Sequence, residues 1–180
     1  MLTQEDIIAG CIKDKPQAQK ALYAKYAYTL MGICLRYTNS RPEAEDILQE
    51  AFIKIFSRIK SYKGEGSFDG WLKRITVTTA IDHYHQQKKK FNHVGYDEIG
   101  ETEADNQNVL NKITTDELLK TLQELPDGYR MVLNLYAIEG YSHQEISEML
   151  HISEGTSRSQ LAKARRLLET ILIKKKLVDA

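Results

Sequence analysis

The chain has 180 residues, and its 25 basic residues balance its 25 acidic ones, so the formal net charge is zero. With 42% hydrophobic and 28% charged residues, the composition is typical of a globular protein that forms an apolar core. No apolar run approaches the ~20 residues that span a bilayer, and the first ten residues lack the layout of a secretory signal. We therefore expect a cytoplasmic protein with no membrane insertion. The two cysteines cannot form a disulfide framework.

The zero net charge is the sum of opposed blocks along the chain. Residues 1–92 carry a net charge of +5, residues 93–114 carry −4 and residues 115–155 carry −6. Residues 156–176 then carry +6. Charge asymmetry of this kind bears on binding partners more than the total does. It leaves two basic segments that suit a nucleic-acid partner.

Residues 1–92 are expected to form four helices, at about 4–13, 16–37, 41–60 and 68–90. The helix starts carry residues that cap or begin helices, namely Thr3 with Asp6, Pro16, Ser40 with Pro42 and Glu43, and Ser67. The helix at 41–60 has one broad apolar stripe with a period of 3.6, made of Ile47, Leu48, Ala51, Phe52, Ile55, Phe56 and Ile59.

Residues 93–113 are acidic, rich in amides and aperiodic, which predicts a flexible linker. Further helices are expected at about 114–125, 129–139, 142–150 and 156–175. No segment has the alternating pattern of a β-strand. We therefore expect an all-α protein of two small helical modules joined by the acidic linker. The expected domains are residues 1–92, 93–113 and 114–180, the last a helix-turn-helix bundle.

The segment from Gly140 to Lys175 has the length and pattern of a helix-turn-helix, with a short capped helix, a few turn residues and a basic helix. The apolar residues of the basic helix recur on its inner face, at Leu161, Ala164, Leu168 and Ile171. Small, hydroxyl and basic side chains on the opposite face suit the base edges of a major groove. The residues expected to bind duplex DNA are Thr156, Arg158, Ser159, Gln160, Ala162, Lys163, Arg165 and Arg166. The alternative is a solvated basic face on an ordinary bundle helix.

The helix that begins at Phe68 is a second candidate nucleic-acid surface. Trp71, Arg74 and Thr78, with Asp82 beyond them, fall on one face, and the helix ends in a lysine run at 88–90. An aromatic ring beside a cation, with lysines beyond, can stack bases and neutralise phosphates. The alternative places Phe68 and Trp71 in the core and leaves the lysines as a solvated helix end.

The helix at 41–60 has a polar face opposite its apolar stripe, formed by Glu43, Asp46, Gln49, Glu50 and Lys54. This face is either a docking surface for a protein partner or a solvated face whose acidic residues favour the helix dipole. Signals for catalysis are poor, because no His-Glu-x-x-His, Walker or Gly-x-Ser-x-Gly motif occurs. We expect no catalytic residue, metal site or cofactor.

Several of these segments resemble bacterial RNA polymerase sigma factors, in the order that the family shows. Residues Ala44–Phe56 are similar to the polymerase-binding helix of that family, and Phe68–Ile75 with Ile81 and Asp82 to its promoter-melting helix. The segments that resemble the C-terminal module of the family are Leu125–Arg130, Glu139–Ser142, Ser153–Ser159 and Ala164 with Arg165. Two modules, an acidic linker and this length resemble the extracytoplasmic-function group.

The resemblance implies a factor that binds core RNA polymerase, directs it to promoters and melts the minus-ten region, without being an enzyme. Its implied partners are the coiled coil of the largest polymerase subunit, the polymerase flap, promoter DNA and an anti-sigma factor. The implied polymerase-binding residues are Glu45, Asp46, Gln49 and Glu50. Those implied at the minus-ten element are Lys63, Ser67, Phe68, Trp71, Arg74, Thr78, Lys88, Lys89 and Lys90. The basic helix at 156–175 would read the minus-thirty-five element as duplex.

Two residues depart from the pattern of the family. Thr78 stands where asparagine is common, and Ser157 stands where an apolar β-branched residue is common. We interpret Ser157 as a packing variant on the inner side of its helix. One rival hypothesis is a helix-turn-helix transcription regulator that binds DNA without polymerase. A second is an interaction protein with a degenerate sigma fold.

Overall fold

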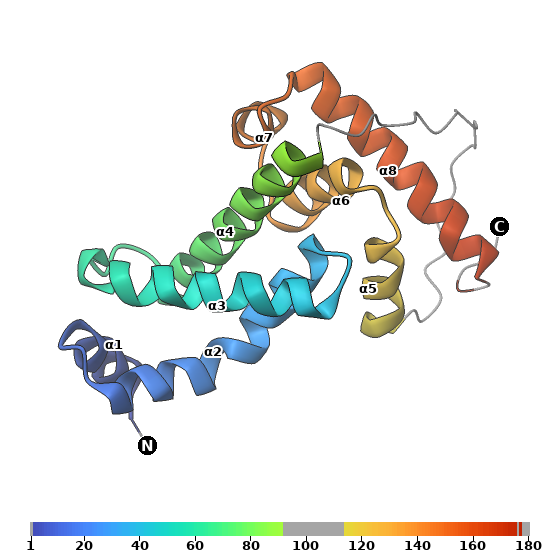
Figure 1. The fold of residues 1–180 in the computed structure, drawn as a ribbon. Coiled ribbons are helices and arrows are strands. Elements are labelled where there is room, and N and C mark those ends of the chain that lie inside the picture. Colours follow the sequence, from blue (N-terminus) through green and yellow to red (C-terminus); the bar gives the residue numbers. More distant parts are fainter. Residues whose placement is uncertain (1, 92–113, 176, 178–180) are drawn as a thin grey trace. The chain divides into compact units, whose positions relative to one another are not determined.

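The structure is a computed structural model that describes residues 2–91, 114–175 and 177 (Figure 1). The described residues form helices and turns with no strand, which confirms the predicted all-α fold. The chain divides into two compact units, Met1–His83 and Tyr84–Ala180. The predicted linker at 93–113 lies outside the described residues, and the three domain ranges proposed above stay predictions.

The first unit contains three complete helices and most of a fourth. They are α1 (Gln4–Ile12), α2 (Pro16–Tyr37), α3 (Arg41–Arg58), which runs into the 3-10 turn η1 (Ile59–Ser61), and α4 (Phe68–Phe91). All four lie where the sequence predicts them. Thr3 forms the predicted cap with Asp6, a capping box, and the Ser40 and Ser67 hydroxyls accept from the Glu43 and Gly70 amides. The Glu43 carboxylate accepts from the Asn39 amide at 3.3 Å, one residue before the N-cap. The helix predicted at 41–60 differs from the structure only at its end, where the last turn tightens from Ile59 into η1.

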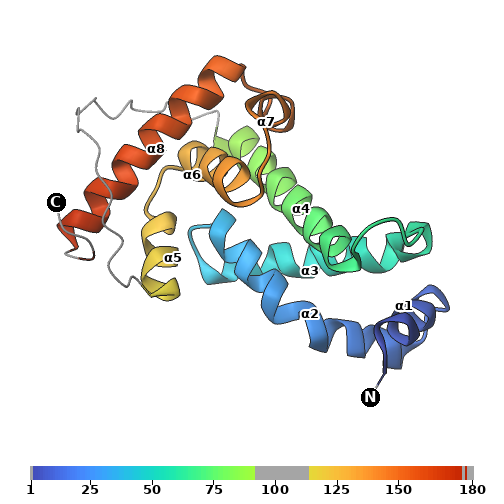
Figure 2. The same cartoon turned by 180° about the vertical axis from the view of Figure 1, so that it is seen from behind.

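A shared apolar core joins these helices, because α2 packs against both α1 and α3 (Figure 2). The contact of α1 with α2 is close. A Cβ added to Gly10 would lie 2.5 Å from the Cβ of Ala18, so glycine is required there. Every residue of the predicted α3 stripe is buried except Phe56, which is half-buried.

The second unit gathers three short helices on one long helix. The short ones are α5 (Thr115–Gln123), α6 (Asp127–Leu133), which continues as the π-helical turn η2 (Asn134–Ile138), and α7 (His143–Leu150). The long one is α8 (Glu154–Lys174), which contacts all three. The capping boxes predicted at the starts of α5 and α7 are both present, at Thr114 with Glu117 and at Ser142 with Glu145.

The helix predicted at 129–139 differs from the structure at both ends. It begins two residues earlier, at Asp127. Its second half widens into η2, where the Glu139 amide bonds the Asn134 carbonyl at 3.0 Å. A wider turn inserts an extra residue into the helical period. Within this wider turn, Tyr136 and Ile138 lie on the surface, at 37% and 49% exposure.

The start of α8 also differs from the prediction, by two residues. The helix begins at Glu154, because the Ser153 hydroxyl accepts a hydrogen bond from the Thr156 amide at 3.0 Å and so caps the first turn. The sequence interpretation had treated Ser153 as part of the connection. The earlier start adds Glu154 to the first turn of α8.

A buried cation joins α5 to α6. Arg130 is 2% exposed, and its guanidinium donates to the carbonyls of Gln123 at 3.2 Å and Leu125 at 2.9 Å and to the carboxylate of Asp127. These bonds satisfy carbonyls that the end of α5 leaves without helical partners. The Arg130 carbonyl in turn accepts from the Asn134 amide group at 2.9 Å, which ties α6 to η2.

We predict that Arg130→Met lowers the free energy of unfolding of the second unit by about 3–5 kcal/mol, because it strands the carboxylate and carbonyls that the guanidinium pairs. Trp71 is the only tryptophan and lies in the first unit. In urea, the far-UV circular dichroism transition should therefore move to lower denaturant while the tryptophan fluorescence transition stays in place.

The control for this prediction is Arg158→Met. It breaks an exposed ion pair with Glu154, 2.7 Å long, and should cost less than about 1 kcal/mol. Equal shifts for the two variants, or a fluorescence transition that moves with the dichroism, would contradict the role given to Arg130.

Candidate nucleic-acid and polymerase interfaces

The outer face of α8 carries the residues predicted to bind duplex DNA. Thr156 and Gln160 are half-buried, and the exposed ones are Arg158, Ser159, Ala162, Lys163, Arg165 and Arg166. The inner face is buried at Leu161, Ala164 and Leu172 and half-buried at Leu168 and Ile171. The predicted separation of a core face from a basic face is confirmed.

The connection before α8 fixes how that helix begins. α7 ends at His151, whose φ of 54° lies in the left-handed region. The hydroxyls of Ser153 and Thr156 lie 2.8 Å apart within the cap. Gln160 lies against the start of α6, because a Cβ added to Gly128 would be 3.4 Å from its amide nitrogen. Gln160 is therefore shared between the outer face and the packing of α8.

Two exposed cations of α8 have close neighbours within the second unit. A guanidinium nitrogen of Arg158 lies 2.7 Å from a carboxylate oxygen of Glu154, one turn earlier. The guanidinium of Arg165 lies 5.8 Å from the ring centre of Tyr136, in η2, a distance suited to a cation–π contact. These contacts hold both cations near the basic face.

A polar contact that sequence reasoning missed joins α7 to α8. Ser157 is fully buried, which confirms its predicted inward position, and its hydroxyl lies 2.9 Å from Nδ1 of His143. The His143 ring stacks on Tyr136 at 4.6 Å. The buried hydroxyl thus has a partner. Helical periodicity gave no signal for it, because the two residues are 14 apart and lie on different helices.

An aromatic cluster supports the first turn of α4. Phe68 is 2% exposed, and its ring centre lies 5.9 Å from that of Tyr26 and 5.1 Å from that of Tyr62. Trp71 is half-buried and stacks on Phe68 at 5.7 Å. The core interpretation therefore fits Phe68, whereas Trp71 keeps part of its ring accessible above a rigid base.

The other minus-ten candidates lie in the preceding loop and along α4. Lys63, Ser67, Arg74 and Thr78 are exposed. The Thr78 hydroxyl donates to the Arg74 carbonyl at 2.8 Å. In the last turn of α4, Lys88 is half-buried and Lys89 and Lys90 are exposed, and this turn belongs to the second compact unit.

A hydrogen bond fastens the start of α4 to α2. The buried Tyr26 hydroxyl donates to a carboxylate oxygen of Asp69 at 2.8 Å. Burial raises the pKa of Tyr26, and the hydrogen bond and the negative charge of Asp69 raise it further, because each disfavours the phenolate.

The polar face of α3 is exposed at Glu45, Asp46 and Gln49 and half-buried at Glu50. Ile53 lies on this face as well, two turns after Asp46, and is 67% exposed. The sequence interpretation missed Ile53 because it looked for a polar face opposite the apolar stripe. A large apolar side chain among polar ones suits contact with a protein more than solvent alone.

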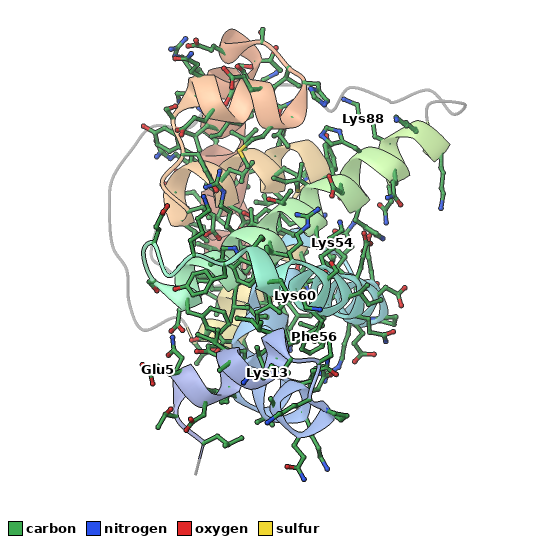
Figure 3. The ribbon with its side chains drawn as sticks, turned by 90° about the vertical axis from the view of Figure 1, so that its left-hand side faces the viewer. Glu5, Lys13, Lys54, Phe56, Lys60 and Lys88 are labelled. Atoms are coloured by element: carbon green, nitrogen blue, oxygen red, sulfur yellow. The ribbon has the colours of Figure 1, made fainter. Side chains whose placement is uncertain are left out.

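Lys54 lies between α3 and α4 (Figure 3), with its ammonium 2.8 Å from a Glu50 oxygen and 2.9 Å from an Asp82 oxygen. Burial lowers the pKa of Lys54, but the hydrogen bonds and charges of both carboxylates outweigh it, so that the pKa is raised. A further contact between these helices joins Nδ1 of His83 to a Glu43 oxygen at 3.5 Å.

All three candidate surfaces, on α3, α4 and α8, fall within segments that match a known family. Residues 22–90 match Sigma-70 region 2, and residues 115–168 match Sigma-70, region 4. The RNA polymerase sigma-H factor of Pseudomonas aeruginosa is 27% identical, over 96% of each chain. The ECF RNA polymerase sigma-E factor of Haemophilus influenzae is 29% identical, over 93% of this chain and 94% of its own. The chain is a sigma factor of the extracytoplasmic-function type.

A solved structure shares this fold. A sigma factor RpoE in complex with the anti-sigma factor NepR from Bartonella quintana is similar with a TM-score of 0.52 at 18% identity, over 85% of this chain and 95% of that one. The matches to Sigma-70 regions 2 and 4 make this sigma factor a transcription initiation factor that directs RNA polymerase to promoters. Its region 2 match contains the α3 face and α4, and its region 4 match contains α8 as far as Leu168.

Two further findings concern membrane spans and metal sites, and they cover only the residues that the structure describes. There, no helix is long and apolar enough to cross a membrane. Nor do three or more histidine, cysteine, aspartate or glutamate side chains gather there in a group that suits a metal ion.

We predict that the stability of the first unit falls as the pH rises above about 10, the usual pKa of tyrosine. The pKa of Tyr26 is higher in the folded than in the unfolded chain, so its stabilisation is fully present below that pH and is lost above it. Tyr26→Phe should lower the free energy of unfolding by about 1–3 kcal/mol at neutral pH and make the alkaline decline shallower.

The readout is urea unfolding followed by tryptophan fluorescence between pH 7 and 11. Tyr28→Phe is the matched control, because Tyr28 lies on the same helix and is 91% exposed. It should leave both the neutral value and the alkaline decline unchanged. A Tyr26→Phe chain with the same pH dependence as Tyr28→Phe would refute the coupling to Asp69.

Proposed function

We propose that this sigma factor binds core RNA polymerase through the exposed face of α3, captures the melted minus-ten strand with the start of α4, and reads the minus-thirty-five element with the outer face of α8. One observation carries the proposal. The side chains assigned to these roles lie at least partly on the surface, except Phe68, while the apolar residues between them form the cores.

The proposal for α8 is supported by its two-sided character. The buried side fixes the helix against α5, α6 and α7, and the exposed side offers Lys163 and Arg166, with Arg158 and Arg165 at its flank. Cations address guanine edges and phosphates, and the Ser159 hydroxyl serves either kind of base pair. An α-helix with this face fits a major groove.

The proposal for α4 assigns different roles to its two aromatic residues. Trp71 contacts an unstacked base, while Phe68 supports Trp71 from the core instead of touching DNA. Base–aromatic stacking is worth about 1–3 kcal/mol per base, which offsets the cost of removing that base from the duplex. Lys63, Arg74 and the terminal lysines of α4 would contact phosphates, with a marked dependence on salt.

The α3 face is proposed to hold the coiled coil of the largest polymerase subunit. Glu45, Asp46, Gln49 and Glu50 supply acceptors for a basic partner, and Ile53 supplies an apolar contact one turn beyond Gln49. The second unit is proposed to contact the polymerase flap. An anti-sigma factor is proposed as a further partner, supported by the complex in the similar solved structure. The chain would act in the cytoplasm beside the polymerase and would itself be no enzyme, since the polymerase supplies the chemistry.

The proposal is tested by run-off transcription with core polymerase on a promoter library. We expect the wild-type chain to direct initiation and Trp71→Ala to lower open-complex formation at least tenfold, in line with the loss of one stacked base. Permanganate reactivity of thymines in the minus-ten region measures melting directly, and Trp71→Phe should give an intermediate value. Circular dichroism checks that the variants fold.

The rival, a helix-turn-helix regulator that acts without polymerase, makes the opposite prediction. It would bind duplex DNA tightly alone, fail to bind core polymerase in a pull-down, and direct no initiation. Failure of the folded wild-type chain to initiate on any promoter would overturn the proposal.

Recognition of the minus-thirty-five element should depend on the first half of α8. We predict that Arg158→Ala and Lys163→Ala each weaken binding of the holoenzyme to the upstream duplex by about 1–3 kcal/mol if they contact bases. A phosphate contact would instead reduce the salt slope by about 1. Lys174→Ala, an exposed lysine at the far end of the same helix, is the control and should have little effect. Equal effects at all three positions would argue for a merely basic helix.

A further inference from the structure

We propose that Lys54 binds a phosphate of single-stranded DNA. In the free protein, Glu50 occupies the Lys54 ammonium, and it releases the ammonium when RNA polymerase engages Glu50. The inference deepens the proposed function, because it uses the α3 face as the polymerase site and the α4 face as the DNA site. Lys54 belongs to the polar face of α3, and the inference gives it a role in DNA binding that the proposed function does not.

The geometry places Lys54 at the boundary of the two surfaces. Its ammonium bonds a carboxylate of each, Glu50 on α3 at 2.8 Å and Asp82 on α4 at 2.9 Å. Asp82 follows Thr78 by one turn on the face that also carries Trp71. The Lys54 side chain keeps 23% of its surface exposed, so it is only partly shielded from solvent.

In the free protein, the combined charge of Lys54, Glu50 and Asp82 disfavours DNA binding. Two carboxylates share one ammonium, so the group of Lys54, Glu50 and Asp82 carries a net charge of −1 beside the proposed path of the strand. Removing Glu50 from the group leaves a neutral pair. It also releases one N–H donor of the ammonium, which has three. The same site then changes from repelling a phosphate to accepting one.

Polymerase engagement supplies that change. Glu50 is 39% exposed in its side chain and lies on the face with Asp46 and Gln49, so a cation of a docked partner can take its carboxylate from Lys54. The coupling is reciprocal by thermodynamic necessity, since a phosphate on Lys54 would equally favour transfer of Glu50 to the polymerase. DNA capture is thereby strengthened only where polymerase is present.

The simpler interpretation is that Lys54 merely bridges α3 and α4. A bridge predicts that loss of either partner changes stability and leaves DNA affinity unaffected beyond the general effect of charge. The two interpretations therefore differ in salt dependence, which counts phosphate contacts and does not respond to stability.

The experiment measures binding of the isolated full-length chain to a fluorescently labelled single-stranded oligonucleotide across a salt series. Glu50→Gln removes the carboxylate that occupies Lys54. Glu45→Gln is the matched baseline, because it also removes one carboxylate of α3 and releases a cation one turn away, Arg41 at 2.9 Å, within the same helix. No polymerase is present, so the α3 face has no other partner in the assay.

We expect Glu50→Gln to bind about fivefold to tenfold more tightly than Glu45→Gln at 50 mM salt, with a salt slope steeper by about 0.7, the value for one phosphate contact on a single strand. Adding Lys54→Met to Glu50→Gln should abolish both gains. Equal affinities and slopes for Glu50→Gln and Glu45→Gln, or gains that survive Lys54→Met, would overturn the inference. Wild-type run-off transcription separates this result from the proposed function, which stands if initiation persists and fails if it does not.

Discussion

Half of the α-helices that the structure describes are too short to be stable alone. α1, α5, α6 and α7 have nine, nine, seven and eight residues, whereas isolated helices shorter than roughly 12–15 residues are marginal in water. Each exists because a longer helix contacts it, α2 in the case of α1 and α8 in the case of the others. Capping boxes and the Arg130 guanidinium satisfy the helix ends that this packing leaves.

The long helices consequently have two purposes, since one side completes a core and the other side forms a binding surface. α8 buries Leu161 and Ala164 while it exposes Arg165, and α4 buries Phe68 while it exposes Arg74. A side chain on a helix that is packed along its opposite face is held in a fixed frame. Less conformational freedom is then lost when DNA binds, which favours recognition by small surfaces.

Just as the charges of the whole chain cancel, some cations of the proposed DNA surfaces are neutralised locally by carboxylates. Cations on or beside the proposed DNA surfaces are paired with carboxylates, Arg158 with Glu154 and Lys54 with Glu50 and Asp82. Exposed pairs of this kind add little stability. They do reduce the field that approaching DNA meets. For a sigma factor, this arrangement favours DNA binding on the polymerase over DNA binding alone.

The sequence by itself determined approximately where the helices lie, most of their caps and the two-sided character of α8, because periodicity and capping act over a few residues. It also placed Ser157 inward. Only the tertiary structure decided that Phe68 is buried while Trp71 is half-exposed, that Ser157 meets His143, and that Lys54 is shared by two helices. These contacts join residues far apart in the chain. Which of them form depends on how complete helices pack against one another, and local sequence patterns carry no record of that packing.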